Sequence, residues 1–383
     1  MDAFITAANG WFPGEPVSNE DIEKVLGELP SGPSRLRHRI LTRNGIHTRY
    51  YAIDRETREP TLTTAQLAAE GIRALLQDAD TPLSDVDLLA CATSVPDQVV
   101  PGHASMVHGE LGSHPCEIVT THGVCCSSMT ALKYAAMAVH SGTDKAVVSA
   151  AERTSSFLRA PHFTAEIKAR TAAEEADPTI GFDQEFLRWM LSDGAGSALV
   201  ERAPRPGQLS LKVEWIEHHS FAHDLATCMY MGGKRTDTGA LQGWRDTPSI
   251  DHAVQGGWFN LHQDVRILGK HVIEVSITRT LAEIRKRRKL SSADVDWMLP
   301  HYSSEYFRAK AFEELEKAGL PIPYEKWRSN LVERGNTGCA SILIMLADFL
   351  ASGDLEEGQG VLLVVPESGR FSSAWAMLRA VRG

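Results

Sequence analysis

Two neighbouring cysteines, Cys125 and Cys126, precede an apolar, alanine-rich run in the stretch THGVCCSSMTALKYAAMAVHSG. A thiol at the start of a helix feels the positive end of the helix dipole, and the free backbone N–H groups there favour the thiolate. The same N–H groups stabilise a developing oxyanion. The stretch therefore predicts a nucleophilic cysteine. Its alternative is a pair of small core residues, since free cysteine is among the most buried residue types.

A thiolate nucleophile needs an imidazole partner, usually at the end of a strand. His301 ends the apolar run DVDWMLPH directly after Pro300, which fixes the backbone, and it is the best placed of the 15 histidines. Asn336, in RGNTGCAS, offers an amide that donates a hydrogen bond without titrating. Asn336 is also a good helix cap, and both roles are compatible.

Apolar, β-rich runs alternate with helical periodicity, which predicts parallel α/β packing. The expected elements, in chain order, are a helix over 64–77, a strand in DVDLLACATS, a helix over 102–111, a strand in CEIVTT, a helix over 128–140 and a strand in KAVVSAAE. The same order returns after about residue 265.

The two ends of the chain carry one pattern. LSDVDLLACATS matches SADVDWMLPHYS. CCSSMTALKYAAMAVHSG matches NTGCASILIMLADFLASG, and both segments of this second pair end at Ser-Gly. Cys125 and Asn336 lie equally far before that stop. A pseudo-twofold duplication would bring these two helix starts together at the axis, although apolar helices and Asp-rich turns also match by chance.

We accordingly expect a first half over 1–205 that carries the nucleophile and a second half over 269–383 that carries His301 and Asn336. Between them, 206–268 is predicted as an irregular loop or lid region, because it is rich in Gly, Trp, His and Asp.

Composition narrows the function classes. With 383 residues, 43% hydrophobic and 23% charged, the chain is predicted to be globular. A formal charge of −10 disfavours nucleic acid, and no apolar run is long enough to span a membrane. Six cysteines without a leader-like N-terminus predict reduced thiols and a cytoplasmic protein, and no ligand motif proposes a metal.

The set GVCCSSMTAL, LPHYSS and ERGNTGCAS resembles the Cys-His-Asn triad of the β-ketoacyl-acyl carrier protein synthase III enzymes of the thiolase superfamily. Further segments resemble the same family: RNGIHTRYY, ATSVPDQVVPG, LSDGAGSALVE and SGRFSSAWAML. This resemblance implies a thiolase-like α/β fold with duplicated βαβ halves in five α-β-α-β-α layers, and a homodimer.

The resemblance also implies a Claisen condensation, decarboxylative in the family, that joins the acyl group to a malonyl or β-ketoacyl thioester in fatty acid or secondary-metabolite biosynthesis. Cys125 would take an acyl group, His301 and Asn336 would bind the second thioester, and the N–H groups of Cys125 and Gly369 would form the oxyanion hole. Cys126 would be structural. No permanent cofactor is implied, since substrates arrive as thioesters of coenzyme A or acyl carrier protein.

The sequence departs from the family at three places. Tyr302, Ser303 and Ser304 replace Gln-Ala-Asn, the terminal glycine run is reduced to Gly369 within PESGRF, and Arg39 stands where a Trp stacks on the adenine of coenzyme A. Loss of that Trp favours carrier-protein delivery, with the basic run RKRRK, 285–289, as a docking segment or simply a solvated helix end.

Three further residues are expected to contact substrate. They are Arg43, Val100, which would line the partner's acyl pocket, and Glu367. Glu367 is a candidate extra base, as in the subgroup that forms cyclohexanediones or dialkylresorcinols, and otherwise a surface residue in a turn.

Two other function classes remain open. An acyltransferase would pass the Cys125-bound acyl group to an alcohol or amine, and a non-catalytic thiolase-like partner subunit would lack turnover.

Overall fold

The computed structural model describes residues 2–29, 37–163 and 186–383. Within these residues, nine strands form one hydrogen-bonded sheet in the order β13-β14-β15-β8-β1-β7-β6-β4-β5. The strands are β1 (Phe4–Trp11), β4 (Leu88–Thr93), β5 (Glu117–His122), β6 (Lys145–Glu152), β7 (Gly194–Glu201), β8 (Leu209–Ser220), β13 (Trp297–Pro300), β14 (Gly360–Glu367) and β15 (Ser372–Arg382). β4 is parallel to β5 and β6, and β13 is parallel to β14.

The strand order contains one arrangement twice. β4, β6, β7 and β1 of the first half correspond to β13, β14, β15 and β8 of the second, and the halves join where β1 pairs with β8 over only two residues, Phe4 and Ile5. Beyond β13, a parallel bridge between Met298 and Trp327 occupies the place that β5 holds beyond β4. The duplication predicted from the sequence is therefore confirmed.

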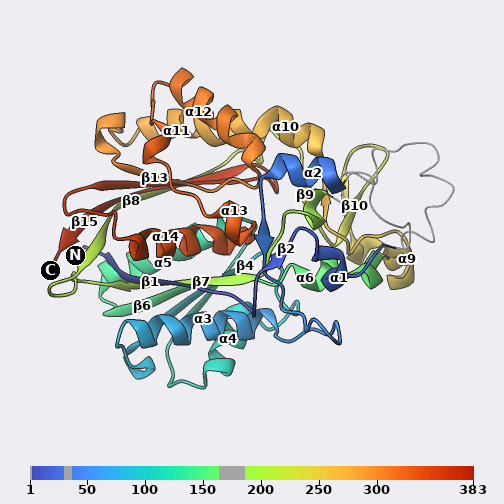
Figure 1. The fold of residues 1–383 in the computed structure, drawn as a ribbon, viewed down its shortest axis with the longest axis horizontal. Helices are drawn as coiled ribbons and strands as arrows, with labels where there is room; N and C mark the ends of the chain where they lie inside the picture. Colours follow the sequence, from blue (N-terminus) through green and yellow to red (C-terminus); the bar gives the residue numbers. More distant parts are fainter. Residues whose placement is uncertain (1, 30–36, 164–185) are drawn as a thin grey trace.

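The sheet folds over at the β1–β8 junction, so that its halves lie on either side of two central helices (Figure 1). Helices α10, α11 and α12 cover one outer face, and α3 and α4 cover the other. The helix bounds are α3 (Thr64–Asp78), α4 (His103–Leu111), α5 (Ser127–Ser141), α10 (Val265–Glu274), α11 (Thr280–Arg285), α12 (Arg308–Lys317) and α14 (Ser341–Ser352). The five α-β-α-β-α layers are as expected.

The central helices α5 and α14 are apolar because each of them packs against strands of both halves of the sheet. In α14, SILIMLADFLAS, eight of the 12 residues are buried, and α5 packs closely through small residues such as Ala131 and Ala135. By contrast α3 is amphipathic, and a reciprocal capping box between Thr63 and Gln66 fixes its start. The predicted elements of the first half are confirmed, with boundaries shifted by no more than a few residues.

One expectation was wrong in part. The stretch 206–268 was predicted to be irregular, but β8 is a long strand inside the sheet, paired along its length with β15. The sequence of this strand, LSLKVEWIEHHS, does alternate apolar and polar residues. The loops that follow dominate the composition of the stretch, and for that reason the strand was not predicted.

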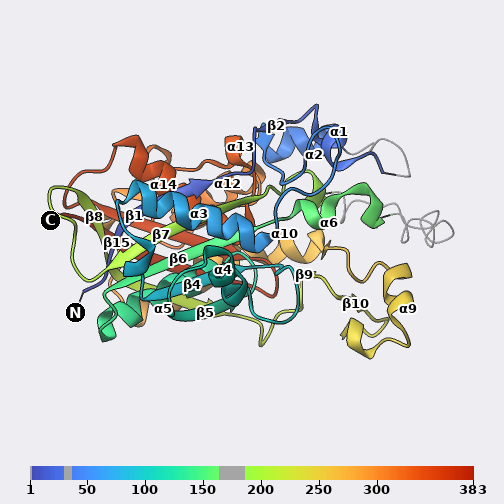
Figure 2. The same cartoon turned by 90° about the horizontal axis from the view of Figure 1, so that it is seen from below.

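The remainder of this stretch forms a small extension at one end of the molecule (Figure 2). We call residues 221–263 the lid. Its elements are β9 (Met229–Tyr230), β10 (Gly233–Arg235), β11 (Leu241–Gly243), α9 (Ile250–Gln255) and β12 (His262–Gln263), with β9 pairing β12 and β10 pairing β11.

The remaining helices and strands are short. They are α1 (Ile22–Leu26), α2 (Arg37–Asn44), α6 (Ser155–Leu158), α13 (Leu331–Arg334), β2 (Val17–Ser18) and β3 (Thr48–Arg49).

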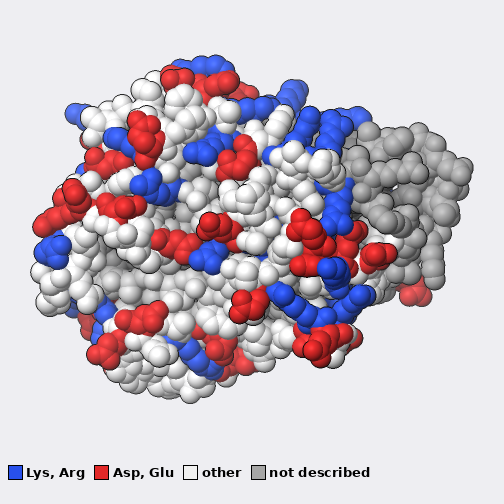
Figure 3. All heavy atoms as spheres, viewed as in Figure 1, with Lys and Arg blue, Asp and Glu red and all other residues white. Residues whose placement is uncertain are grey.

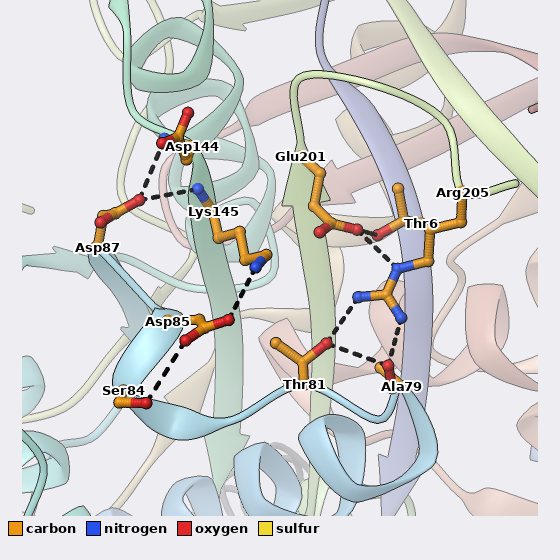
Figure 4. A network of polar contacts seen from close by, with 10 residues as sticks. All are labelled: Thr6, Ala79, Thr81, Ser84, Asp85, Asp87, Asp144, Lys145, Glu201 and Arg205. Atoms are coloured by element: carbon orange, nitrogen blue, oxygen red, sulfur yellow. Dashed lines mark hydrogen bonds and ion pairs between the residues drawn. The ribbon is translucent and has the colours of Figure 1, made fainter.

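The opposite end of the first half is held by a polar network (Figure 4). Lys145 forms an ion pair with Asp85 at 3.1 Å, and the Asp87 carboxylate accepts hydrogen bonds from the backbone of Asp144 and Lys145. Nearby, Arg205 pairs with Glu201 at 2.7 Å. These contacts tie the starts of β4 and β6 together, far from the strand ends that carry Cys125.

No helix in the described residues is long and apolar enough to cross a membrane.

Candidate active site

Cys125 lies in the turn between β5 and α5. The turn is held by Ser127, whose backbone N–H and hydroxyl both donate to the Val124 carbonyl, at 3.1 and 2.7 Å. Cys126 is completely buried, with its sulfur 3.2 Å from the carbonyl oxygen of Val365, whereas Cys125 is only partly buried. The geometry therefore leaves Cys125 accessible and encloses Cys126.

His301 follows β13, and its backbone N–H donates to the Val364 carbonyl at 2.8 Å, which extends the pairing with β14. The side chain is only 5% exposed. Burial lowers the pKa of His301 to about 4, so its imidazole is neutral at physiological pH. A neutral imidazole is the form that accepts a proton.

Asn336 is fixed on both sides by backbone contacts. Its N–H donates to the Met190 carbonyl at 3.0 Å, and its own carbonyl accepts from Ser192 at 2.9 Å. The side-chain oxygen accepts from the N–H of Gly338 at 3.0 Å, which leaves the amide NH₂ free to donate. Asn336 thus combines the local turn role and the donor role that its position before α14 predicted.

Two cavities meet at Cys125. The inner cavity, about 70 Å³, is lined by Cys125, His301 and apolar side chains of α10 and α12, including Val272 and Ala311. The large cavity, about 690 Å³, is lined by Cys125 and Asn336, together with apolar residues. Three residues line both cavities: Cys125, Ser303 and Ser368. The structure therefore brings the sulfur, the imidazole and the carboxamide around one connected space.

A third hollow, the outer cavity, of about 200 Å³, opens beside α2 and is lined by Arg39 and Arg43. It shares Leu268 and Phe307 with the inner cavity. The outer cavity therefore adjoins the inner cavity, and Arg43 lines the outer one; its contact with substrate stays a prediction.

Gly369 lies in the loop after β14, against the Cys125 turn. A Cβ added at position 369 would lie 3.0 Å from the Val124 side chain, so a larger residue would push the loop or this side chain away. The Gly369 carbonyl accepts hydrogen bonds from Cys228 and Met229 of the lid, at 2.8 and 3.1 Å. The lid thereby holds the peptide that carries the expected oxyanion donor.

Glu367 lies against the same turn but lines none of the three cavities. Its carboxylate accepts from the N–H of Val124 at 3.3 Å. Burial raises the pKa of Glu367, opposed by hydrogen bonds from the backbone of Val124 and Cys126. The structure therefore does not bring Glu367 into contact with the substrate space, where the sequence placed it.

The electrostatics of Cys125 differ from the expectation. Burial raises the pKa of the Cys125 thiol, and the Glu367 and Glu152 carboxylates raise it further. These effects outweigh the helix N-terminus, because a thiolate would be poorly solvated and would face two negative groups. Cys125 is therefore a thiol at rest, and a base must take its proton during acyl transfer.

Val100 is 78% exposed, beside Gln98 and Val99, which line the open end of the large cavity. Its expected role in a partner's pocket stays a prediction.

Sequence reasoning missed several residues of the site. Glu152 is buried in the large cavity, where it accepts hydrogen bonds from the N–H groups of Ser94 and Cys339, both at 3.1 Å. A carboxylate at the end of an apolar strand, KAVVSAAE, was the available signal. No sequence signal identified the lid residues that line the same cavity, because they lie in a segment without helical or strand periodicity. These residues include Met229, Met231, Trp244, Phe259 and Leu261.

Comparison with known proteins gives three results. Residues 286–377 match the family model 3-oxoacyl-[acyl-carrier-protein (ACP)] synthase III C terminal. The chain is 24% identical over 378 residues to β-ketoacyl-[acyl-carrier-protein] synthase III of Methylococcus capsulatus, covering 98% of both proteins.

Among solved structures, it resembles AbyA1, described as a tetronic acid condensing enzyme, with a TM-score of 0.75, 21% identity and coverage of 98% and 99% of the two chains. It also resembles a variant of OleA from Xanthomonas campestris, with a TM-score of 0.73, 19% identity and coverage of 99% and 98%. The structural likenesses show a shared fold over nearly the whole length, and the family match includes His301, Asn336 and Gly369.

Proposed function

The chain is a β-ketoacyl-acyl carrier protein synthase III-like protein with the thiolase fold, and from this premise we propose that it is a ketosynthase. It joins an acyl group held on Cys125 to a second thioester by Claisen condensation, with formation of a carbon–carbon bond.

In the first step the Cys125 sulfur attacks the carbonyl carbon of an acyl thioester. Because the thiol is protonated at rest and the imidazole of His301 is neutral, His301 accepts the thiol proton and returns it to the departing thiol. The N–H groups of Cys125 and Gly369 stabilise the oxyanion of the tetrahedral intermediate.

In the second step another thioester occupies the inner cavity. Its enolate forms when a malonyl group loses carbon dioxide through cleavage of the bond between the α-carbon and the carboxylate, or when the α-hydrogen of a β-ketoacyl group passes to His301 as a proton. His301 and the free amide of Asn336 donate hydrogen bonds to the carbonyl oxygen of this thioester as its enolate forms. These hydrogen bonds stabilise the enolate. The enolate carbon attacks the acyl group on Cys125, and the carbon–sulfur bond breaks.

One observation carries this proposal. Cys125 lines both cavities, with His301 in the wall of one and Asn336 in the wall of the other. A single sulfur that faces two substrate spaces suits a reaction that joins two acyl groups.

The size of the large cavity supports an acyl group well beyond acetyl. Its volume of about 690 Å³ lies within the range of pockets that enclose a whole small ligand. Its far wall is apolar, with Phe157, Leu187 and Met190, and its lid side includes two methionines, which adapt to chains of different shape.

The mouth of the outer cavity supports delivery by an acidic carrier protein. Arg39, Arg43, Arg266 and Lys270 are exposed on α2 and α10, where Lys and Arg gather in Figure 3, and none of them forms an ion pair with a described residue. Positive charge at a narrow opening attracts an anionic partner.

The basic run 285–289 is a poorer docking segment than the sequence suggested. Arg288 pairs with Glu217 at 2.9 Å, Lys286 pairs with Glu283 at 2.7 Å, and Arg285 donates to the carbonyls of Ala318 and Gly319. Most of the positive charge of this run is therefore already engaged in contacts with other residues of the same chain.

A homodimer is supported by the free edge of the sheet. β5 ends the strand order and is largely exposed along its length. Exposed apolar residues, Ile118, Tyr134 and Met137, lie on β5 and α5, and Val99 and Val100 are also exposed. We expect two copies to pair edge to edge through β5, which would cover this surface.

The test of the proposal supplies an acyl-coenzyme A together with a malonyl or β-ketoacyl thioester and analyses the product. A ketosynthase gives a product with a new carbon–carbon bond, which is lost in Cys125→Ala. If the acyl group instead appears only on an added alcohol or amine, the chain is an acyltransferase and the proposal fails.

A further inference from the structure

The point where the two cavities meet carries two hydroxyl groups. Ser303 follows the His301 segment and Ser368 lies in the Gly369 loop, and each lines both cavities beside Cys125. Around them the inner cavity is mostly apolar, with Leu268, Val272 and other aliphatic side chains. A few convergent polar groups in an apolar cavity orient a ligand through its own polar atoms.

The Ser368 hydroxyl is held in place. The side-chain NH₂ of Gln263 donates to the Ser368 oxygen at 2.9 Å, and Gln263 is only 4% exposed. Because the oxygen accepts from Gln263, the hydroxyl hydrogen is left to donate.

Ser303 is also free to donate. Within the described part of the chain its hydroxyl makes no hydrogen bond. Both serines therefore offer a donor toward the junction of the cavities.

The four donors used in the proposed mechanism already have roles. The N–H groups of Cys125 and Gly369 serve the oxyanion on the first acyl group, and His301 and Asn336 serve the carbonyl of the second thioester. The two hydroxyls are therefore left for an additional oxygen. We propose that Ser303 and Ser368 bind the oxygen on the β-carbon of the second substrate, so that this substrate is a β-ketoacyl thioester; this inference rests on the proposed ketosynthase function.

A malonyl thioester fits this arrangement less well. It also has oxygens beyond the α-carbon, but they belong to a carboxylate that must lose its charge as carbon dioxide leaves. Hydrogen bonds to that carboxylate stabilise the ground state more than the transition state and therefore slow decarboxylation. A β-keto oxygen gains charge as the enolate forms, so the same hydrogen bonds accelerate its reaction.

The step with a β-ketoacyl thioester balances without loss of carbon dioxide. The carbon–hydrogen bond between the two carbonyls breaks, and the neutral imidazole of His301 takes the proton. The imidazolium so formed then donates to the thioester oxygen of the enolate, beside the amide of Asn336. The enolate carbon attacks the acyl carbonyl on Cys125, a carbon–carbon bond forms and the carbon–sulfur bond breaks. The Cys125 thiolate then recovers the proton from His301.

The experiment uses the full chain with Cys125 loaded from octanoyl-coenzyme A, and compares acetoacetyl-coenzyme A with malonyl-coenzyme A as second substrate. Ser303→Ala and Ser368→Ala should each lower kcat/KM for acetoacetyl-coenzyme A about tenfold, the loss typical of one buried hydrogen bond. Malonyl decarboxylation, measured as carbon dioxide release, should be unchanged or faster. Ser84→Ala, an exposed serine at the opposite end of the sheet, is the matched control.

Loading of Cys125, measured by the mass of the intact protein, separates the possible failures. If the wild type does not load, the proposed function itself fails. If the variants load normally and lose activity equally with both second substrates, or lose none with acetoacetyl-coenzyme A, the role of the hydroxyls as β-oxygen ligands is overturned.

Discussion

The backbone N–H of Val124 donates to the Glu367 carboxylate at 3.3 Å, which places a negative group at the turn that carries Cys125. Glu367 follows Val124 by 243 residues, and the two meet because β14 lies beside the start of α5. Burial raises the pKa of the Cys125 thiol, and the Glu367 carboxylate raises it further, so both oppose the effect of the helix dipole.

Replacing Glu367 with Gln should make Cys125 more reactive. Removing the negative charge lowers the pKa of the thiol, so a larger fraction is thiolate at neutral pH. The rate of alkylation by iodoacetamide at pH 7 should rise severalfold, and its pH profile should move to lower pH. Arg370→Gln, at an exposed side chain of the same loop, is the control. An unchanged profile in Glu367→Gln would show that this carboxylate does not tune the thiol.

His301 makes stability depend on pH. Its pKa is lowered by burial from 6.5 to about 4, so the unfolded chain binds this proton more readily than the folded one. The stabilising contribution is complete above pH 6.5 and is lost as the pH falls toward 4, which at pH 5 amounts to about 2 kcal/mol. Urea unfolding at pH 7 and pH 5 should show a smaller loss in His301→Asn than in the wild type. Equal losses in the two proteins would mean that His301 is not buried in its neutral form.

The basic mouth predicts a defect confined to carrier-protein substrates. Replacing Arg43 with Glu should raise KM for an acyl-carrier-protein thioester about fivefold at low salt, since an exposed ion pair contributes up to ~1 kcal/mol. Added salt should reduce the difference. Lys289→Glu, in the run 285–289, should behave as the wild type. A raised KM in Lys289→Glu together with an unchanged KM in Arg43→Glu would mean that the carrier protein docks on the run 285–289.

The lid wall sets the length of the acyl chain that loads. Met229 lines the large cavity, so Met229→Trp should exclude the longest acyl groups while short ones still load. Mass spectrometry of the protein after incubation with a series of acyl-coenzyme A thioesters measures this limit. Leu241→Trp, at a lid residue that is 43% exposed, should leave the series unchanged. A limit that does not move in Met229→Trp would place the acyl chain elsewhere.

Much of this site was predictable because duplication repeats a local pattern. Cys125 and Asn336 mark equivalent helix starts, and His301 ends a strand that the pattern identifies. The duplicated βαβ halves followed from the same repetition, and the five layers followed from the resemblance to the synthase III family.

The remainder depends on contacts between segments that no local pattern connects. Ser303 and Ser368 matter only because two loops meet at Cys125, and Met229 matters because the lid folds over the cavity. The protonation state of Cys125 was predicted wrongly for the same reason: the helix dipole is visible in sequence, while burial and the approach of Glu367 are tertiary.

The most direct measurement of the central claim is the mass of the intact protein after exposure to acyl thioesters of coenzyme A and acyl carrier protein. The wild type should gain the mass of one acyl group, on the peptide that contains Cys125, and Cys125→Ala should gain none. Acyl transfer to Cys126 instead, or an unmodified wild-type protein that remains folded, would contradict the account.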